Sequence, residues 1–164
     1  MKKILLFTII SAFIFTACGK KEDSAGIKPG LSCDIDGKSW VGDTTANITK
    51  GGDFYSISAS QGNIFGPQFE FLNISLKGEL KPGDYSLTTE NDQSYAIFNS
   101  TITKKDKKSE NDFDAFHSTD GKVSITKVDD SHAEGTFNYT LVTVDEPKKT
   151  LKVTNGKFNL KIVK

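Results

Sequence analysis

The stretch GTFNYTLVTVDEPKKTLKVTNGKFNLKIVK, residues 135–164, decides the fold class. In residues 135–144 and 151–154 apolar side chains alternate with polar ones at the two-residue period of a half-buried β-strand, and they do so again at Phe158, Leu160 and Ile162. Asn155-Gly156 lies between the apolar residues Val153 and Phe158 and is a type I′ turn signal. This turn signal predicts a terminal β-hairpin in which Leu151 and Val153 lie against Phe158, Leu160 and Ile162.

Upstream of this stretch, short apolar runs separated by turn residues begin at Leu31. Asp36-Gly37 and Gly51-Gly52 each predict a hairpin turn. In residues 69–76 the apolar positions shift from odd to even numbers, which predicts either a bulge or burial on both faces. The chain is expected to form an all-β, antiparallel domain of roughly ten strands, with a β-sandwich and a partly closed barrel both open. The other predicted strands are 46–49, 54–59, 85–89, 95–103 and 123–128.

Residues 104–120 break the strand rhythm with a long, highly charged segment, which predicts a solvated loop with at most a helical turn near 112–116. Its acids could supply oxygen ligands for calcium, but their spacing lacks the tight-turn glycine, and interleaved lysines would repel a cation. No metal is therefore expected. The acids are Asp106, Glu110, Asp112 and Asp114, and the lysines are Lys104, Lys105, Lys107 and Lys108.

The N-terminus has the three zones of a bacterial signal peptide. Two lysines precede an apolar run, residues 4–15, that is too short to span a bilayer as a helix. The run closes with Phe15-Thr16-Ala17-Cys18, which resembles the lipobox of bacterial lipoproteins, with Phe15 where leucine is usual. We therefore expect residues 1–17 to be removed and Cys18 to be lipidated, so that the protein is anchored in a membrane.

Residues 18–30 are polar and punctuated by glycine and proline, as in a flexible tether, and the β-domain is expected to occupy residues 31–164. Within the tether, Lys21-Glu22-Asp23 resembles the export signal of Bacteroidota surface lipoproteins. That resemblance implies a place in the outer membrane. Exposure at the cell surface and retention on the periplasmic side both remain open.

The composition of the chain argues against one class of partner, nucleic acid. The 21 basic residues are all lysine and equal the 21 acids, and loss of the signal peptide leaves a net charge of −2. Without arginine or a basic surplus, nucleic acid is not an expected partner. Lipidation of Cys18 leaves Cys33 without a disulfide partner, and its place between apolar neighbours predicts a buried core thiol.

Two segments carry a family resemblance. Residues Cys33–Trp40 (CDIDGKSW), together with Gly135-Thr136-Phe137 and residues 153–158 (VTNGKF), resemble the ends of an uncharacterised family of Bacteroidota lipoproteins, a domain of unknown function. The resemblance implies a lineage and a fold but no activity. Core packing explains Trp40 and Phe158, while Gly37 and Gly156 are expected at positive φ in turns.

No catalytic set is apparent. The chain has only two histidines, His117 and His132, and no Gly-x-Ser-x-Gly elbow, so neither an enzyme nor a cofactor is expected. A haem held between the two histidines, on loops flanking residues 123–128, is the alternative. Most of the aromatic cluster formed by Phe54, Tyr55, Phe65, Phe69 and Phe71 is expected to pack in the core.

A binding role follows by elimination. Phe65, in the loop 62–67, is the candidate for an exposed, partner-facing tip, and residues 97–103 are a candidate edge for pairing with a partner strand. The expected function is that of a non-enzymatic surface module for an unidentified protein or glycan. The alternative is a periplasm-facing accessory or inhibitor lipoprotein that caps a partner protein, and the oligomeric state stays open.

Overall fold

The computed structural model describes residues 27–63, 68–89, 93–101, 113–146 and 148–163. Within these ranges the chain forms ten β-strands and no helix, which confirms the predicted all-β fold. The strands are β1 (Gly30–Ile35), β2 (Lys38–Val41), β3 (Asn47–Gly51), β4 (Phe54–Gly62), β5 (Phe69–Lys77), β6 (Gly83–Ser86), β7 (Tyr95–Ser100), β8 (Asp114–Val128), β9 (His132–Thr143) and β10 (Thr150–Val163).

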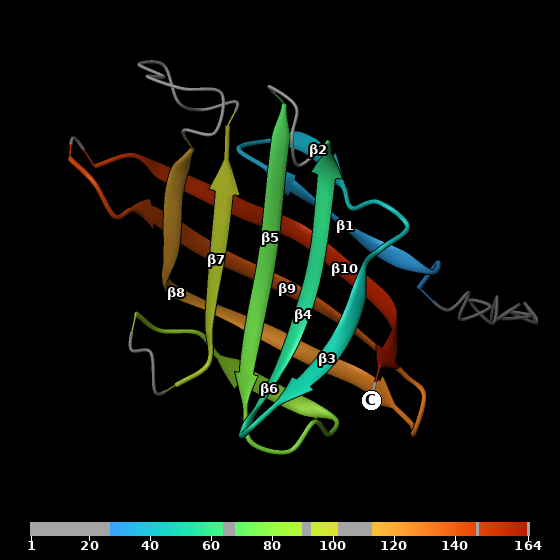
Figure 1. The fold of residues 1–164 in the computed structure, drawn as a ribbon. Coiled ribbons are helices and arrows are strands. Elements are labelled where there is room, and N and C mark those ends of the chain that lie inside the picture. The colour runs from blue at the N-terminus through green and yellow to red at the C-terminus, as the bar shows by residue number, and fades with distance from the viewer. Residues whose placement is uncertain (1–26, 64–67, 90–92, 102–112, 147, 164) are drawn as a thin grey trace, which may run out of the picture.

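Seven strands close into a barrel in the order β10-β3-β4-β5-β7-β8-β9 and back to β10. All neighbours in this ring are antiparallel except β10 and β3. The 15-residue β8 and the 14-residue β10 are long enough to pair with two strands along one edge, so β6 joins β8, and β1 followed by β2 joins β10. Figure 1 shows β3, β4, β5 and β7 as a front layer that crosses the long strands behind it.

Aromatic and aliphatic side chains fill the barrel. Phe98 packs edge-on against Trp40, with ring centroids 6.5 Å apart, and lies 6.1 Å from the ring of Phe116. On the long strands, Phe137 stacks between Tyr139 and Phe158 at centroid distances of 5.7 and 6.4 Å. All six of these side chains are at most 4% exposed, so the interior is a packed core.

Three glycines on the inner face of the long strands make room for this stack. Each lies directly opposite an aromatic residue of the neighbouring strand, and a Cβ at any of the three would overlap that residue. The cross-strand pairs are Gly135 with Phe158, Gly156 with Phe137, and Gly121 with Tyr139. An aromatic ring lying over a glycine fills the gap that the missing side chain would leave. This packing explains Gly135, Phe137, Gly156 and Phe158, four of the residues that carried the family resemblance.

The predicted terminal hairpin is wrong. Residues Thr150–Val163 form one strand, and β10 pairs with β9 on both sides of Asn155-Gly156. The turn signal appears instead as a β-bulge, in which Asn155 takes the positive φ of 55°. Gly156 is not at positive φ, and its lack of a side chain is required by the ring of Phe137.

Part of the predicted charged loop is also wrong. Residues 102–112 lie outside the described part, but Asp114–Val128 is a single strand, so no helical turn forms at residues 114–116. Alternation along its start places Asp114, Phe116 and Ser118 inside the barrel. Because Asp114 and Ser118 on the buried face are polar, the start of this strand does not show the apolar–polar alternation by which a strand is predicted from sequence. The proposed edge strand is wrong as well, because β7 lies between β5 and β8.

Other predictions hold. Asp36 and Gly37 both take positive φ in the β1–β2 hairpin, and Gly52 does so between β3 and β4. The register of β5 with both neighbours is continuous, which excludes a bulge, and the two sets of apolar positions face opposite ways: Leu72, Ile74 and Leu76 are buried in the barrel, whereas Phe69 and Phe71 are half-buried on the outside. Cys33 is a free, buried thiol as expected.

Burial, with the nearby charges of Asp34 and Glu70, raises the pKa of Cys33 to about 12. Burial, with Cys33 close by, also raises the pKa of Tyr139.

The raised pKa of Cys33 predicts how stability depends on pH. A thiol in the unfolded chain ionises above about pH 8.5, so the unfolded state loses this proton before the folded state does. Stability should therefore fall above that pH, with Cys33 contributing about 1.4 kcal/mol per pH unit. Urea denaturation from pH 7 to 11 should show a shallower fall for Cys33→Ala, and equal slopes would contradict this origin.

Candidate functional site

Because the interior is packed, a binding surface of the described residues has to lie on the outside of the barrel. Strand alternation turns 13 side chains outward from the middle of β4, β5 and β7 and from the adjoining parts of β8 and β9, and the outward-facing Phe54 and Lys77 at one end and Phe69 at the other border them. We call this surface the uncharged face, because it contains no lysine, aspartate or glutamate. Its members are Ser56, Ser58, Ser60, Phe71, Asn73, Ser75, Tyr95, Ile97, Asn99, Ala115, His117, Val142 and Val144.

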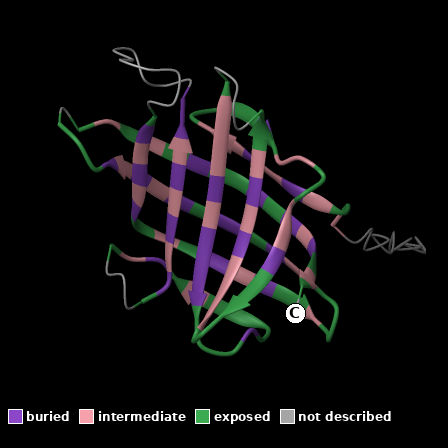
Figure 2. Cartoon of the chain, viewed as in Figure 1, coloured by how far each residue is buried: buried purple, intermediate pink, exposed green. Residues whose placement is uncertain are grey.

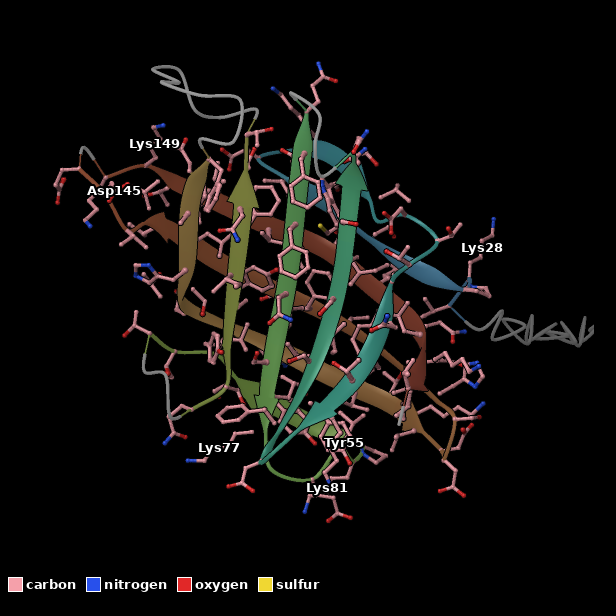
Figure 3. The ribbon with its side chains drawn as sticks, in the orientation of Figure 1. Lys28, Tyr55, Lys77, Lys81, Asp145 and Lys149 are labelled. Carbon is pink, nitrogen blue, oxygen red and sulfur yellow. The ribbon has the colours of Figure 1, made fainter. Side chains whose placement is uncertain are left out.

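The opposite wall has the reverse character. Outward positions of β10 and of the paired halves of β8 and β9 form what we call the charged wall, which carries Lys122, Lys127, Glu134, Lys152, Lys157 and Lys161. Figure 2 shows buried and intermediate residues along β4, β5 and β7, with exposed residues only at one end of β4 and one end of β5. In Figure 3 the labelled lysines Lys77 and Lys81 lie near the end of β5, while Lys28 lies beside β1 and Lys149 near the start of β10. A quarter of the chain is charged, so this separation distinguishes the uncharged face.

Hydrogen bonds order the centre of the uncharged face. The Asn73 amide donates to the Ser58 hydroxyl at 2.8 Å, and the Ser75 hydroxyl donates to the Asn73 carbonyl oxygen at 2.9 Å. At the rim the Ser60 hydroxyl donates to the carboxylate of Asp43 at 2.7 Å. These bonds fix the side chains of the face before any ligand arrives, which lowers the entropic cost of binding.

Apolar groups lie among these polar ones. Phe71, Tyr95, Ile97 and Val142 are partly exposed on the outer wall, although most residues of their type would be sought in a core. The prediction that most of the aromatic cluster packs in the core is therefore wrong for the described members, since Phe54, Phe69 and Phe71 are half-buried on the outer side of the barrel and only Tyr55 packs against the core. Rigid aromatic rings among serine and asparagine are the composition of a binding surface.

A depression of about 570 Å³ lies at one end of the barrel, between the β3–β4 turn and the end of β5. The Lys50 ammonium group lies 5.7 Å from the centroid of the Tyr55 ring there. The volume suits a small ligand. However, both lysines and acids line its rim, so the depression favours neither an anionic nor a cationic ligand. It is lined by Lys50, Gly52, Asp53, Tyr55, Lys77, Gly78 and Glu79.

The two histidines do not come together. His117 pairs with Val142, and His132 lies ten positions earlier on the same strand β9, so about 33 Å of extended chain separates the two sites. Neither lies on a loop beside a separate 123–128 strand, as the haem alternative assumed. His117 belongs to the uncharged face, whereas the ring of His132 bonds with Ser131 at its strand end.

Of the four acids considered for calcium, Asp106, Glu110 and Asp112 lie outside the described residues. Asp114 is buried and forms an ion pair with Lys149 at 2.6 Å. Among the residues described, no three histidine, cysteine or acidic side chains gather as a metal site would require. Cys18 and Phe65, the predicted lipidation site and loop tip, also lie outside the described residues.

The fold and this surface define the class of protein: a filled β-barrel domain with one uncharged outer wall. The chain belongs to the family described as a domain of unknown function (DUF6252), whose model matches residues 28–160. Neither a curated protein nor a solved structure matches the chain. In the part of the chain that the structure describes, no helix is long and apolar enough to cross a membrane.

Proposed function

We propose that this chain is a lipid-anchored protein of the cell envelope that binds a partner through the uncharged face and catalyses no reaction. The observation that carries the proposal is the run of 13 outward positions without a charged residue, on a barrel whose interior is already filled. An outer wall without charges repels neither ligand nor partner, and little hydration has to be removed when it is covered.

The absence of catalysis is part of the proposal. His117 is the only imidazole of the uncharged face, and within the described residues no serine, cysteine or carboxylate hydrogen-bonds to it. A nucleophile, a base and a group that orients the base normally stand in hydrogen-bond contact. The face has instead the fixed polar and apolar groups that recognition uses.

The support for the proposed membrane anchor comes from the sequence. Removal of residues 1–17 and lipidation of Cys18 would hold the barrel at a membrane through the tether 18–30. Lys21-Glu22-Asp23 favours the outer membrane and exposure at the cell surface. From such an anchor the barrel can present its uncharged face to a partner, since a flexible tether of 13 residues has a root-mean-square length of about 20 Å.

The two histidines give a direct test of occupancy. His117 lies on the uncharged face and His132 on the other side of the barrel, and the chain has no third histidine. Cell envelopes and purified full chain would be treated with diethylpyrocarbonate, and carbethoxylation of each histidine would be measured by mass spectrometry. We expect His117 to react several-fold more slowly in the envelope than in the purified protein, because its partner covers it there.

His132 serves as the internal control and should react at the same rate in both samples. Equal protection of both histidines would indicate general shielding by the envelope. Equal reactivity of His117 in the two samples would contradict occupancy of the uncharged face.

A further inference from the structure

The uncharged face offers hydrogen-bonding groups without a charge that would select an ion. Ser56, Asn99 and the Tyr95 hydroxyl form no side-chain hydrogen bond within the described part of the chain. Asn73 and Ser58, although bonded to each other, retain further donor and acceptor capacity. A charged ligand would lose hydration here and gain no ion pair, so a matching ligand is neutral and carries both donors and acceptors.

Aromatic rings at two places on the face set the shape of that ligand: Phe71 at one, and Tyr95, with Phe54 packed edge-on at a centroid distance of 6.3 Å, at the other. Phe71 pairs with Asn99 and Tyr95 pairs with Ser75, which lies four residues further along β5 than Phe71. Four residues of extended strand span about 13 Å, so the rings stand at opposite ends of the face with polar groups between them. A ligand that contacts both rings is elongated, with apolar surfaces separated by hydrogen-bonding groups. A chain of pyranose rings has this pattern, because each ring has an apolar C–H face and a rim of hydroxyl groups.

The extent of the face favours such a chain over a second protein. Five strands about 4.8 Å apart, each contributing about five residues of 3.3 Å, cover on the order of 400 Å². A stable protein interface takes about 800 Å² from each partner. A second copy of this chain would therefore be held weakly by the face alone, whereas several sugar units fit within it.

We propose that the uncharged face binds a neutral glycan chain. This inference rests on the proposed function and names the ligand class of the same surface. Phe71 and Tyr95 contact the apolar faces of sugar rings, while Asn73, Asn99 and the half-buried serines Ser56, Ser58 and Ser60 bond to their hydroxyl groups. Weak binding by one copy is multiplied when many lipid-anchored copies engage one polymer.

Affinity electrophoresis tests the proposal. The full-length, detergent-solubilised chain would be run through gels that contain neutral polysaccharides (α-glucan, β-glucan, mannan or galactan) or, for comparison, the acidic polymer pectate. We expect at least one neutral polymer to retard the protein and pectate not to do so. Phe71→Ala should bind that polymer about tenfold more weakly, the effect of losing roughly 1.4 kcal/mol of contact. Lys157→Ala, on the charged wall, should bind as the unsubstituted chain does.

Circular dichroism would establish that Phe71→Ala retains the strand signal. If it does not, Asn99→Ala replaces it and should weaken binding in the same direction. Failure of every neutral polymer to retard the chain, retardation by pectate alone, or equal binding by the face variants would overturn the glycan assignment. Protection of His117 in envelopes together with any of these results would leave the proposed function standing and indicate a protein as the occupant.

Discussion

Replacement of Gly135 by alanine is expected to lower the free energy of unfolding by about 3 kcal/mol, the upper end of the range for overpacking a core. A Cβ at this position would lie 2.5 Å from the Ser124 carbonyl oxygen and 2.6 Å from Cζ of Phe158. Neither neighbour can move cheaply. The Ser124 oxygen belongs to the backbone of the adjoining strand β8, and the fully buried Phe158 ring stacks on Phe137.

Gly51→Ala provides the matched control, because a Cβ at Gly51 meets no atom within 4 Å and its φ is not positive. That variant should be as stable as the unsubstituted chain, or up to about 1 kcal/mol more stable through the unfolded state. Urea denaturation of the full chain in mild detergent, followed by fluorescence of the single tryptophan, Trp40, measures both variants. A Gly135→Ala protein as stable as Gly51→Ala would show that the aromatic stack can shift to admit a methyl group.

The sequence predicted the fold class, the two hairpin turns and the buried thiol, because alternation and turn chemistry act over a few residues. It could not predict closure of the barrel, which depends on contacts between β10 and β3 that are more than 100 residues apart. It also misplaced Asn155-Gly156, because the same dipeptide serves a turn or a bulge, and pairing with β9 on both sides decided for the bulge.

The candidate site was missed for a related reason. The sequence-based candidates were residues of uncommon or reactive types: His117, His132, Phe65 and the acids of the 104–120 segment. The uncharged face consists of ordinary residues, and its signal is the absence of charge at every second position of three strands. That signal is present in residues 56–60, 71–75 and 95–99, but it becomes one surface only when β4, β5 and β7 are known to be neighbours.

Replacement of Cys18 by serine should abolish lipid attachment and remove the protein from the outer-membrane fraction. A serine hydroxyl cannot form the thioether that holds the diacylglyceryl group. Each buried methylene contributes about 0.8 kcal/mol, and one acyl chain alone binds only marginally, so loss of the whole lipid group removes the anchor. The apolar run 4–15 is too short to replace it as a spanning helix. Labelling with radioactive palmitate, followed by density-gradient separation of membranes, measures both effects.

Cys33→Ala is the matched control, because Cys33 is the only other cysteine and lies in the core. It should keep the palmitate label and the membrane location, whereas Cys18→Ser should keep the fluorescence of buried Trp40 and lose both. Continued acylation of Cys18→Ser would overturn the anchor, and protease added to intact cells would report on which side of the outer membrane the barrel lies.

The anchor also affects binding, because a face of on the order of 400 Å² holds a polymer firmly only when many copies share one surface. Cys18→Ser should therefore weaken attachment of cells to the neutral polysaccharide that the uncharged face binds more than it weakens binding of that polysaccharide by the purified chain.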